Sequence, residues 1–188
     1  MTSSGADGSF DFGDAVRERF AFLGRFGFSE IASLPTLVRY RKRDLEVSVY
    51  HGRSSFELGF ELYRGGTCIS LGELIGLTDT EAAGRYRNYA AITPDQILKG
   101  LTLLAGLVPK YAERALRGEA DVFETLKQQR QAWGERYAQE VLACQLRPKA
   151  NEAFRGGNYR LAVELYEQIR SQLSAVELKK VALAKRRL

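Results

Sequence analysis

The 188-residue chain has few of the side chains that enzymes use to hold metals. It contains one histidine, two cysteines, one tryptophan and one methionine. Cys68 and Cys144 stand alone, without the spacing of a zinc-ligand or redox pair, so we expect both to be small buried hydrophobic residues. One histidine and two distant cysteines cannot complete the usual ligand sets, and the acidic residues form no calcium-binding loop. The sequence therefore predicts no metal site.

Phosphate-binding and catalytic motifs are also missing. There is no P-loop and no dinucleotide fingerprint, because Gly24-x-x-Gly27 closes a predicted helix instead of opening one after a strand. His51 ends a predicted strand, and a catalytic role for it would need a nucleophile and an orienting partner, for which Ser54 or Ser55 and Asp44 are nearest in sequence. Nothing in this spacing enforces such a geometry. We expect no cofactor and no catalytic residues, hence a protein that is not an enzyme.

Targeting segments are not evident either. Residues 1–14 lack both the basic and the apolar region of a signal peptide, and the apolar stretch between Lys99 and Lys110 is too short to cross a bilayer. We therefore expect a cytoplasmic protein with no membrane span. The net charge of +5 arises in residues 148–188, which hold nine Lys and Arg against four Asp and Glu. A basic tail can produce the high pI by itself, which weakens the case for a nucleic-acid binder.

The most apolar segment predicts a helix from Thr93 to Gly118. Thr93 and Gln96 occupy N-cap and N3 positions, and Ile92 with Ile97 has the spacing of a hydrophobic staple. Apolar residues continue nearly all round this helix, so we expect it to be buried. Pro109 predicts a kink or break, and Gly118 the end. An earlier helix is expected from Asp14 to Phe26, preceded by a flexible arm over residues 1–13.

Three segments alternate apolar and polar residues with the period of a strand: 37–41, 45–51 and 56–62. Their short connections predict an antiparallel meander with one face in water. By parity, that face carries Arg39, Arg41, Glu46, Tyr50, Glu57 and Glu61, with Arg53 at the adjoining turn. Cross-strand ion pairing is one interpretation of these charges; a binding surface is the other, because Arg and Tyr often anchor interfaces.

The second half of the chain has helical patterns throughout. Capping boxes are expected at Ser70, Thr78, Asp121 and Ser174, and Pro148 predicts a new helix after residue 146. We expect an α+β fold in which a core domain, 14–146, carries a helical hairpin, 147–188. The residues of the hairpin that carry a small and aromatic repeat pattern are Ala150, Ala153, Phe154, Gly157, Asn158, Tyr159, Ala162 and Tyr166. On these residues the hairpin resembles a single tetratricopeptide repeat.

That resemblance implies protein binding in a groove around Asn158, Tyr159 and Tyr166. The front portion, with Phe22-Leu23, Gly27-Phe28 and the run Arg53 to Leu58, resembles small bacterial α+β proteins of uncharacterised function, some of which are similar to toxin-neutralising immunity proteins. The sequence thus predicts a non-catalytic protein-recognition module, either an immunity-type protein or an adaptor. The candidate partner-binding residues are Arg39, Arg41, Tyr50, Arg53, Glu57, Asn158, Tyr159 and Tyr166.

Nucleic-acid binding is the alternative function. The segment 85–89 interleaves arginine with tyrosine, and the C-terminal helix offers Lys179, Lys180, Lys185, Arg186 and Arg187. The same cations also suit the solvated side and the C-terminal dipole of a terminal helix. The identity of a protein partner and the oligomeric state are left open by the sequence.

Overall fold

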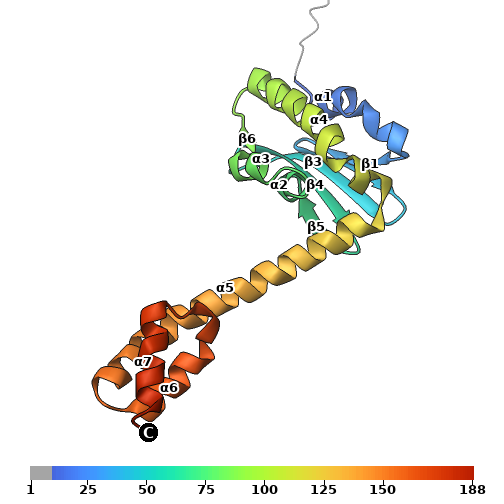
Figure 1. Ribbon diagram of the computed structural model, residues 1–188. Helices are drawn as coiled ribbons and strands as arrows, with labels where there is room; N and C mark the ends of the chain where they lie inside the picture. The colour runs from blue at the N-terminus through green and yellow to red at the C-terminus, as the bar shows by residue number, and fades with distance from the viewer. Residues whose placement is uncertain (1–9) are drawn as a thin grey trace, which may run out of the picture. The chain divides into compact units, whose positions relative to one another are not determined.

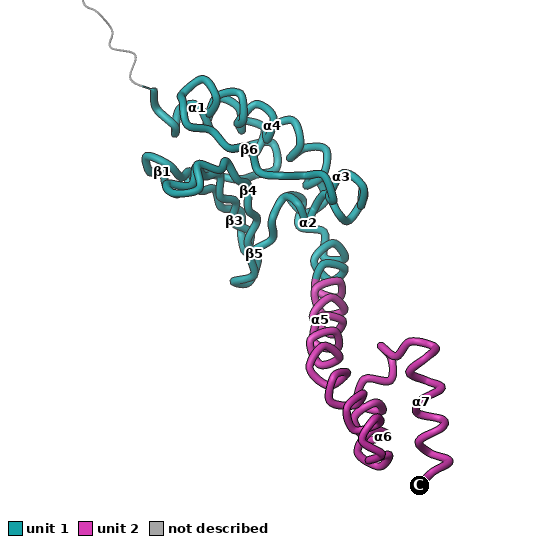
Figure 2. Tube along the Cα trace, turned by 90° about the vertical axis from the view of Figure 1, so that its left-hand side faces the viewer, with its two compact units in different colours: residues 1–126 teal, residues 127–188 magenta. Residues whose placement is uncertain are grey.

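The computed structural model describes residues 10–188, which form an α+β protein of two compact units (Figures 1 and 2). Unit 1 ends at Leu126 and unit 2 begins at Lys127. Of the arm expected over residues 1–13, the first nine residues lie outside the described part. Phe10 packs against the core and Phe12 is buried, so the ordered fold begins earlier than expected.

Unit 1 contains a six-stranded sheet, and its five longer strands form an antiparallel meander in the order β1-β2-β3-β4-β5. The strands are β1 (Ser29–Leu34), β2 (Leu37–Lys42), β3 (Leu45–His51), β4 (Glu57–Arg64), β5 (Thr67–Ser70) and β6 (Tyr89–Ala90), which pairs with β4. The three expected strands are therefore confirmed as β2, β3 and β4. The other three were missed because β1 has almost no buried residue and β5 and β6 are very short.

The helices of unit 1 and one face of the sheet share a single core. They are α1 (Phe12–Arg19), the 3₁₀ helix η1 (Ala21–Phe26), α2 (Leu71–Gly76), α3 (Thr80–Arg85) and α4 (Pro94–Arg117). The expected helix over 14–26 is thus divided at Phe20, and α3 is capped by Asp79 instead of Thr78. Val47 and Phe60 of the sheet join Leu101 of α4 in this core. Figure 1 shows α1 and α4 on the same side of the sheet.

Helix α4 has the ends that its sequence predicts but a different degree of burial. Thr93 and Gln96 form the capping box, and Gly118 adopts the left-handed conformation, φ 85°, that ends the helix. Ile92 is 73% exposed, so the expected staple is absent. Leu103 is also exposed, which shows that one face of the helix is covered and not the whole surface. The helix continues through Pro109 without a break.

Unit 2 is entirely helical. It comprises most of α5 (Ala120–Arg155), followed by α6 (Tyr159–Gln168), the 3₁₀ helix η2 (Arg170–Gln172) and α7 (Ala175–Lys185). The expected start of a new helix at Pro148 is wrong, because Pro148 lies inside α5. The boundary between the compact units consequently falls within a helix and not at residues 146 and 147. No helix within residues 10–188 has the length and hydropathy of a membrane span.

Candidate protein-binding surface

The sheet of unit 1 has one face in the core and one face that no helix of unit 1 buries. Val38, Val47 and Leu62 point into the core and are fully buried. The residues that alternate with them in the strands form what we call the open sheet face: Arg39 and Arg41 of β2, Glu46, Ser48 and Tyr50 of β3, and Glu57, Gly59, Glu61 and Tyr63 of β4. The period-two pattern therefore positions these side chains together, as the sequence predicts.

Charge is unevenly distributed over the open sheet face. The β2 strand contributes only cations, Arg39 and Arg41, whereas β4 contributes the carboxylates Glu57 and Glu61. Arg41 pairs with Glu46 across the strands at 2.6 Å. Within residues 10–188, Arg39 has no acidic partner, and neither glutamate of β4 has a cationic one. Cross-strand ion pairing, the simpler interpretation of this pattern, therefore accounts for only one of the two arginines.

Two tyrosines shape the middle of the face. A Cβ atom added to Gly59 would lie 2.2 Å from the Tyr50 ring, so the missing side chain at this position leaves room for the ring. Burial, together with the nearby Glu61 carboxylate, raises the pKa of Tyr50 to about 12. The Tyr63 hydroxyl donates a hydrogen bond to Glu61. Burial is the larger cause that raises the pKa of Tyr63, and this hydrogen bond is the second. Both phenols therefore remain protonated donors at neutral pH.

Tyr63 and Ser48 were missed as members of the face by sequence reasoning. The predicted third strand ended at Leu62, although its alternation continues through Tyr63 toward the turn at Gly65 and Gly66. Ser48 is only 3% exposed and lies at the centre of the face, where it is in register with Arg39 and Glu61. The alternation of polar and apolar residues is enough to place both residues on this face. It does not predict how deeply each side chain is buried.

Two further residues singled out in the sequence lie where β3 ends. Arg53 is exposed in the loop between β3 and β4. His51 Nε2 lies 2.7 Å from the Ala91 carbonyl oxygen, and its ring contacts those of Phe12 and Phe56. The histidine thereby joins the loop before α4 to the sheet. This placement gives it a packing role and no oriented nucleophile.

The candidate residues of unit 2 are part of its internal structure. Tyr166 is fully buried, whereas Asn158 is exposed and its side-chain oxygen caps α6. Tyr159 is half-buried, packs edge-on against Phe154 and accepts a hydrogen bond from Arg187. Tyr159 is the only one of these three whose side chain combines partial exposure with a neighbouring cation. We therefore leave Asn158 and Tyr166 out of the proposed surface.

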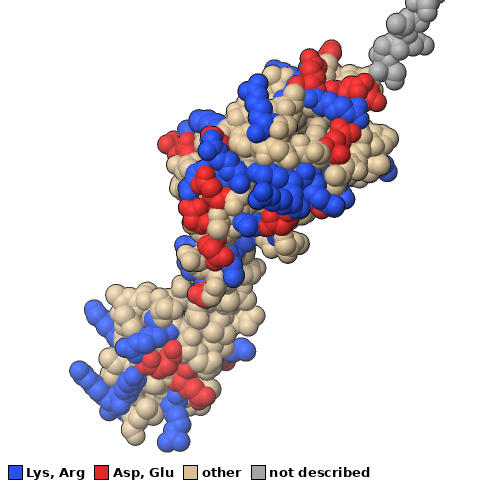
Figure 3. All heavy atoms as spheres, turned by 90° about the vertical axis from the view of Figure 1, so that its right-hand side faces the viewer, with Lys and Arg blue, Asp and Glu red and all other residues tan. Residues whose placement is uncertain are grey.

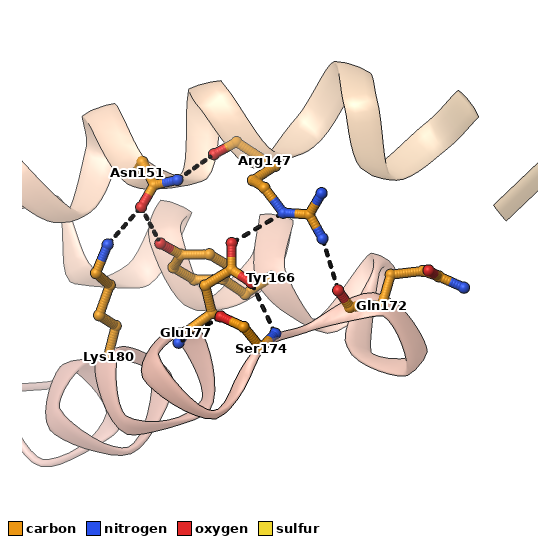
Figure 4. Close-up of polar contacts among 7 residues, drawn as sticks. All are labelled: Arg147, Asn151, Tyr166, Gln172, Ser174, Glu177 and Lys180. Carbon is orange, nitrogen blue, oxygen red and sulfur yellow. Dashed lines mark hydrogen bonds and ion pairs between the residues drawn. The ribbon is translucent and has the colours of Figure 1, made fainter. Parts of the chain in front are cut away.

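A polar network joins the three helices of unit 2 (Figure 4). Arg147 of α5 pairs with Glu177 of α7 at 2.9 Å and donates to the Gln172 carbonyl at 2.6 Å. The Asn151 side-chain oxygen accepts from Tyr166 at 2.9 Å and from Lys180 at 2.6 Å. Burial would raise the pKa of Glu177, but hydrogen bonds from Ser174 and the charge of Arg147 lower it overall. The network is structural, because it links the helices to one another.

The arginine and tyrosine segment at 85–89 lies beside α4. Tyr86 and Tyr89 line a cavity of about 500 Å³ together with Gly100, Leu103 and Leu107 of α4. The Arg87 guanidinium donates to the carbonyls of Gly84 and Tyr86, which end helix α3. The tyrosines of this segment therefore pack against the protein, whereas Arg85 and Arg87 are exposed.

Nothing in the described chain resembles a metal centre. Among residues 10–188, no three side chains of His, Cys, Asp or Glu are grouped so that they could hold a metal ion. The expectation for the cysteines is wrong for Cys144, which is exposed, whereas Cys68 is half-buried. Burial raises the pKa of Cys68 above the ordinary value of a thiol.

Comparisons with protein-family models, with curated proteins and with solved structures found no match to this chain.

Proposed function

We propose that this protein recognises another protein through its open sheet face and catalyses no reaction itself. The observation that supports the proposal is the set of charges on β2 and β4 that have no partner of opposite sign within residues 10–188, with Tyr50 between them. Arg and Tyr are enriched among the residues that dominate binding energy at interfaces. Unpaired charges flanking such an aromatic centre favour a partner with complementary charges.

The mixed sign of the face favours a protein over a nucleic acid. A phosphate backbone requires cations along its path, and Glu57 and Glu61 would repel it. The protein would then act as an immunity-type inhibitor or as an adaptor. Both act by direct binding to another protein, which agrees with a face that carries acidic and basic side chains. Figure 3 shows that acidic and basic side chains also lie side by side over the visible part of unit 1.

The experiment is an affinity capture from a lysate of the native source with matched variants. The variant Arg39→Ala with Tyr50→Ala removes the centre of the face, and Arg85→Ala with Lys99→Ala removes two exposed side chains from α3 and α4. We expect the wild type and the second variant to retain one stoichiometric protein that the first variant loses. Equal capture by all three, with equal thermal stability, contradicts the proposal. Inhibition of a captured toxin-like enzyme would specify the immunity role.

A second candidate function has one observation in its favour. Unit 2 holds 13 Lys and Arg against six Asp and Glu, a net charge of +7. Lys179 and Arg186 of the C-terminal segment have no acidic partner within the described residues, although Lys185 pairs with Glu167 at 2.7 Å. Nucleic-acid association through this segment predicts binding that falls steeply with salt. A salt titration with fluorescent single-stranded DNA tests this, and binding that is absent at low salt excludes it.

A further inference from the structure

Two unpaired charges of the open sheet face, Arg39 and Glu61, are placed so that two copies of the face can complement each other. β2 and β4 are the two neighbours of β3, and each lies about 4.8 Å from it. Arg39, Ser48 and Glu61 are in register across these three strands, so cation and carboxylate stand on either side of a small central residue. Their Cα atoms are about 10 Å apart, and within residues 10–188 the two side chains form no ion pair with each other.

A two-fold axis makes use of this arrangement. When two sheets face each other about an axis that runs between them parallel to β3, each β2 lies over the β4 of the other copy. Such an interface uses the same patch of both copies. Each group of the patch must therefore be compatible with the group at the position that the axis relates to it. On this face the axis places Arg39 of one copy opposite Glu61 of the other, and Ser48 lies beside the axis.

We propose that two copies of this chain associate through their open sheet faces about this axis. The inference rests on the proposed function, because it uses the same surface, and it names a second copy of this chain as an occupant of that surface. In the dimer, Arg39 of each copy faces Glu61 of the other copy, so the contact occurs twice. Packed sheets are about 10 Å apart, a gap that an Arg and a Glu side chain can bridge together. The rings of Tyr50 and its symmetry mate meet near the axis.

The strand on the axis raises one electrostatic objection. Glu46 of β3 lies close to its own copy in such a dimer, and two bare carboxylates there would repel each other. Each Glu46 is, however, already paired with Arg41 at 2.6 Å. The dimer therefore brings two ion pairs together, and the two flanking guanidinium groups separate the carboxylates.

The test exchanges the charges and then mixes the variants. Arg39→Glu places two pairs of carboxylates across the proposed interface, and Glu61→Arg places two pairs of cations there. We expect the wild type to be a dimer by analytical ultracentrifugation and each single variant to dissociate at least about tenfold more easily, as expected when like charges are opposed at a contact. An equimolar mixture of the two variants restores the dimer, because both contacts then join opposite charges. The double variant restores it as well.

The controls separate misfolding from a loss of association. Glu81→Arg and Arg85→Glu exchange the charges of an exposed pair on α3, outside the face, and leave the dimer unchanged. Recovery of the dimer on mixing also shows that both variants are folded. Three results overturn the inference: a wild type that stays monomeric at its highest soluble concentration, single variants that dimerise like the wild type, or a mixture that fails to recover.

These outcomes are distinct from those of the proposed function. A monomeric protein that still captures another protein, in a manner lost on Arg39→Ala with Tyr50→Ala, overturns the dimer and retains the recognition function. A dimer restored by mixing supports the inference whatever the lysate yields. A monomer whose capture does not depend on this face removes both.

Discussion

Two buried tyrosines show how the same side chain can stabilise or destabilise its surroundings. Tyr40 of β2 is 7% exposed, and its hydroxyl is buried with no hydrogen-bond partner among the described residues. Burial raises the pKa of Tyr40 to about 12. Tyr166 is fully buried, but its hydroxyl donates to Asn151 at 2.9 Å. Both rings are in a core, but only the Tyr166 hydroxyl replaces its lost hydrogen bonds to water with a hydrogen bond inside the protein.

The substitution of phenylalanine at these two positions should therefore change stability in opposite directions. Tyr40→Phe removes an unsatisfied buried hydroxyl and is expected to raise the free energy of unfolding by about 1 kcal/mol. Tyr166→Phe removes one hydrogen bond and leaves Asn151 with one donor fewer, at a cost of about 1 kcal/mol. Urea unfolding followed by circular dichroism measures both. A loss of stability in both variants would mean that the Tyr40 hydroxyl has a bonded water.

Arg43 adopts a backbone conformation that suits glycine better. It lies in the two-residue turn between β2 and β3 with φ 54°. The left-handed region costs a residue with a Cβ atom about 1 kcal/mol relative to glycine. Arg43→Gly is therefore expected to raise the free energy of unfolding by about that amount, whereas Arg43→Ala keeps the Cβ atom and gives no gain. Thermal unfolding of the two variants makes the comparison, and an equal effect of both would remove the backbone explanation.

At the scale of elements, three helix starts were predicted because they depend on local side chains. The capping boxes at Ser70, Thr93 and Ser174 are present as predicted, and each needs only residues three positions apart. β1 and β6 were not predictable in this way, because they are defined by pairing with β2 and β4, and β1 has no clear alternation. Parity gave the shared face of Arg39, Arg41, Tyr50 and Glu57.

The site residues of unit 2 were harder to place from sequence. Tyr166 has the helical spacing of a core residue as well as the chemistry of a binding residue, and only packing decides between the two. Asn158 likewise satisfies the N-terminus of α6, a role that its position before Tyr159 already permits. The tetratricopeptide-like pattern does not separate residues that hold the helices together from residues that would contact a partner.

Pro148 offers a test of why α5 is continuous. Proline in a helix interior removes one backbone hydrogen bond and crowds the preceding turn, at a cost of about 3 kcal/mol in an exposed helix. Pro148 is exposed and lies in the part of α5 that carries the Arg147 and Asn151 contacts to α6 and α7. Pro148→Ala is expected to stabilise unit 2 by up to about 3 kcal/mol. Slower amide hydrogen exchange over residues 143–155 measures this gain, and faster exchange would contradict it.

At the scale of the whole molecule, the two units differ in charge and in what stabilises them. Unit 1 holds 15 Lys and Arg against 17 Asp and Glu, whereas unit 2 has a net charge of +7. The core of unit 1 contains most of the buried aliphatic and aromatic side chains, and the core of unit 2 is a smaller cluster around Ala150, Ala162 and Tyr166. Unit 2 therefore depends more heavily on its polar network, in which Glu177 is the only buried carboxylate.

Acid should consequently destabilise unit 2 through Glu177. The pKa of Glu177 in the folded protein lies below its ordinary value of 4.5, so the unfolded chain binds the proton more tightly. The stabilisation is present above pH 4.5 and is lost as the pH falls through the folded pKa. Glu177→Gln should lower stability at neutral pH and reduce the acid sensitivity, whereas Glu164→Gln, at an exposed site on α6, should do neither. Peptide-resolved hydrogen exchange between pH 7 and pH 3, corrected for the intrinsic exchange rate, measures the stability of each unit separately. If unit 2 has the same acid sensitivity in the wild type and in Glu177→Gln, another group controls it.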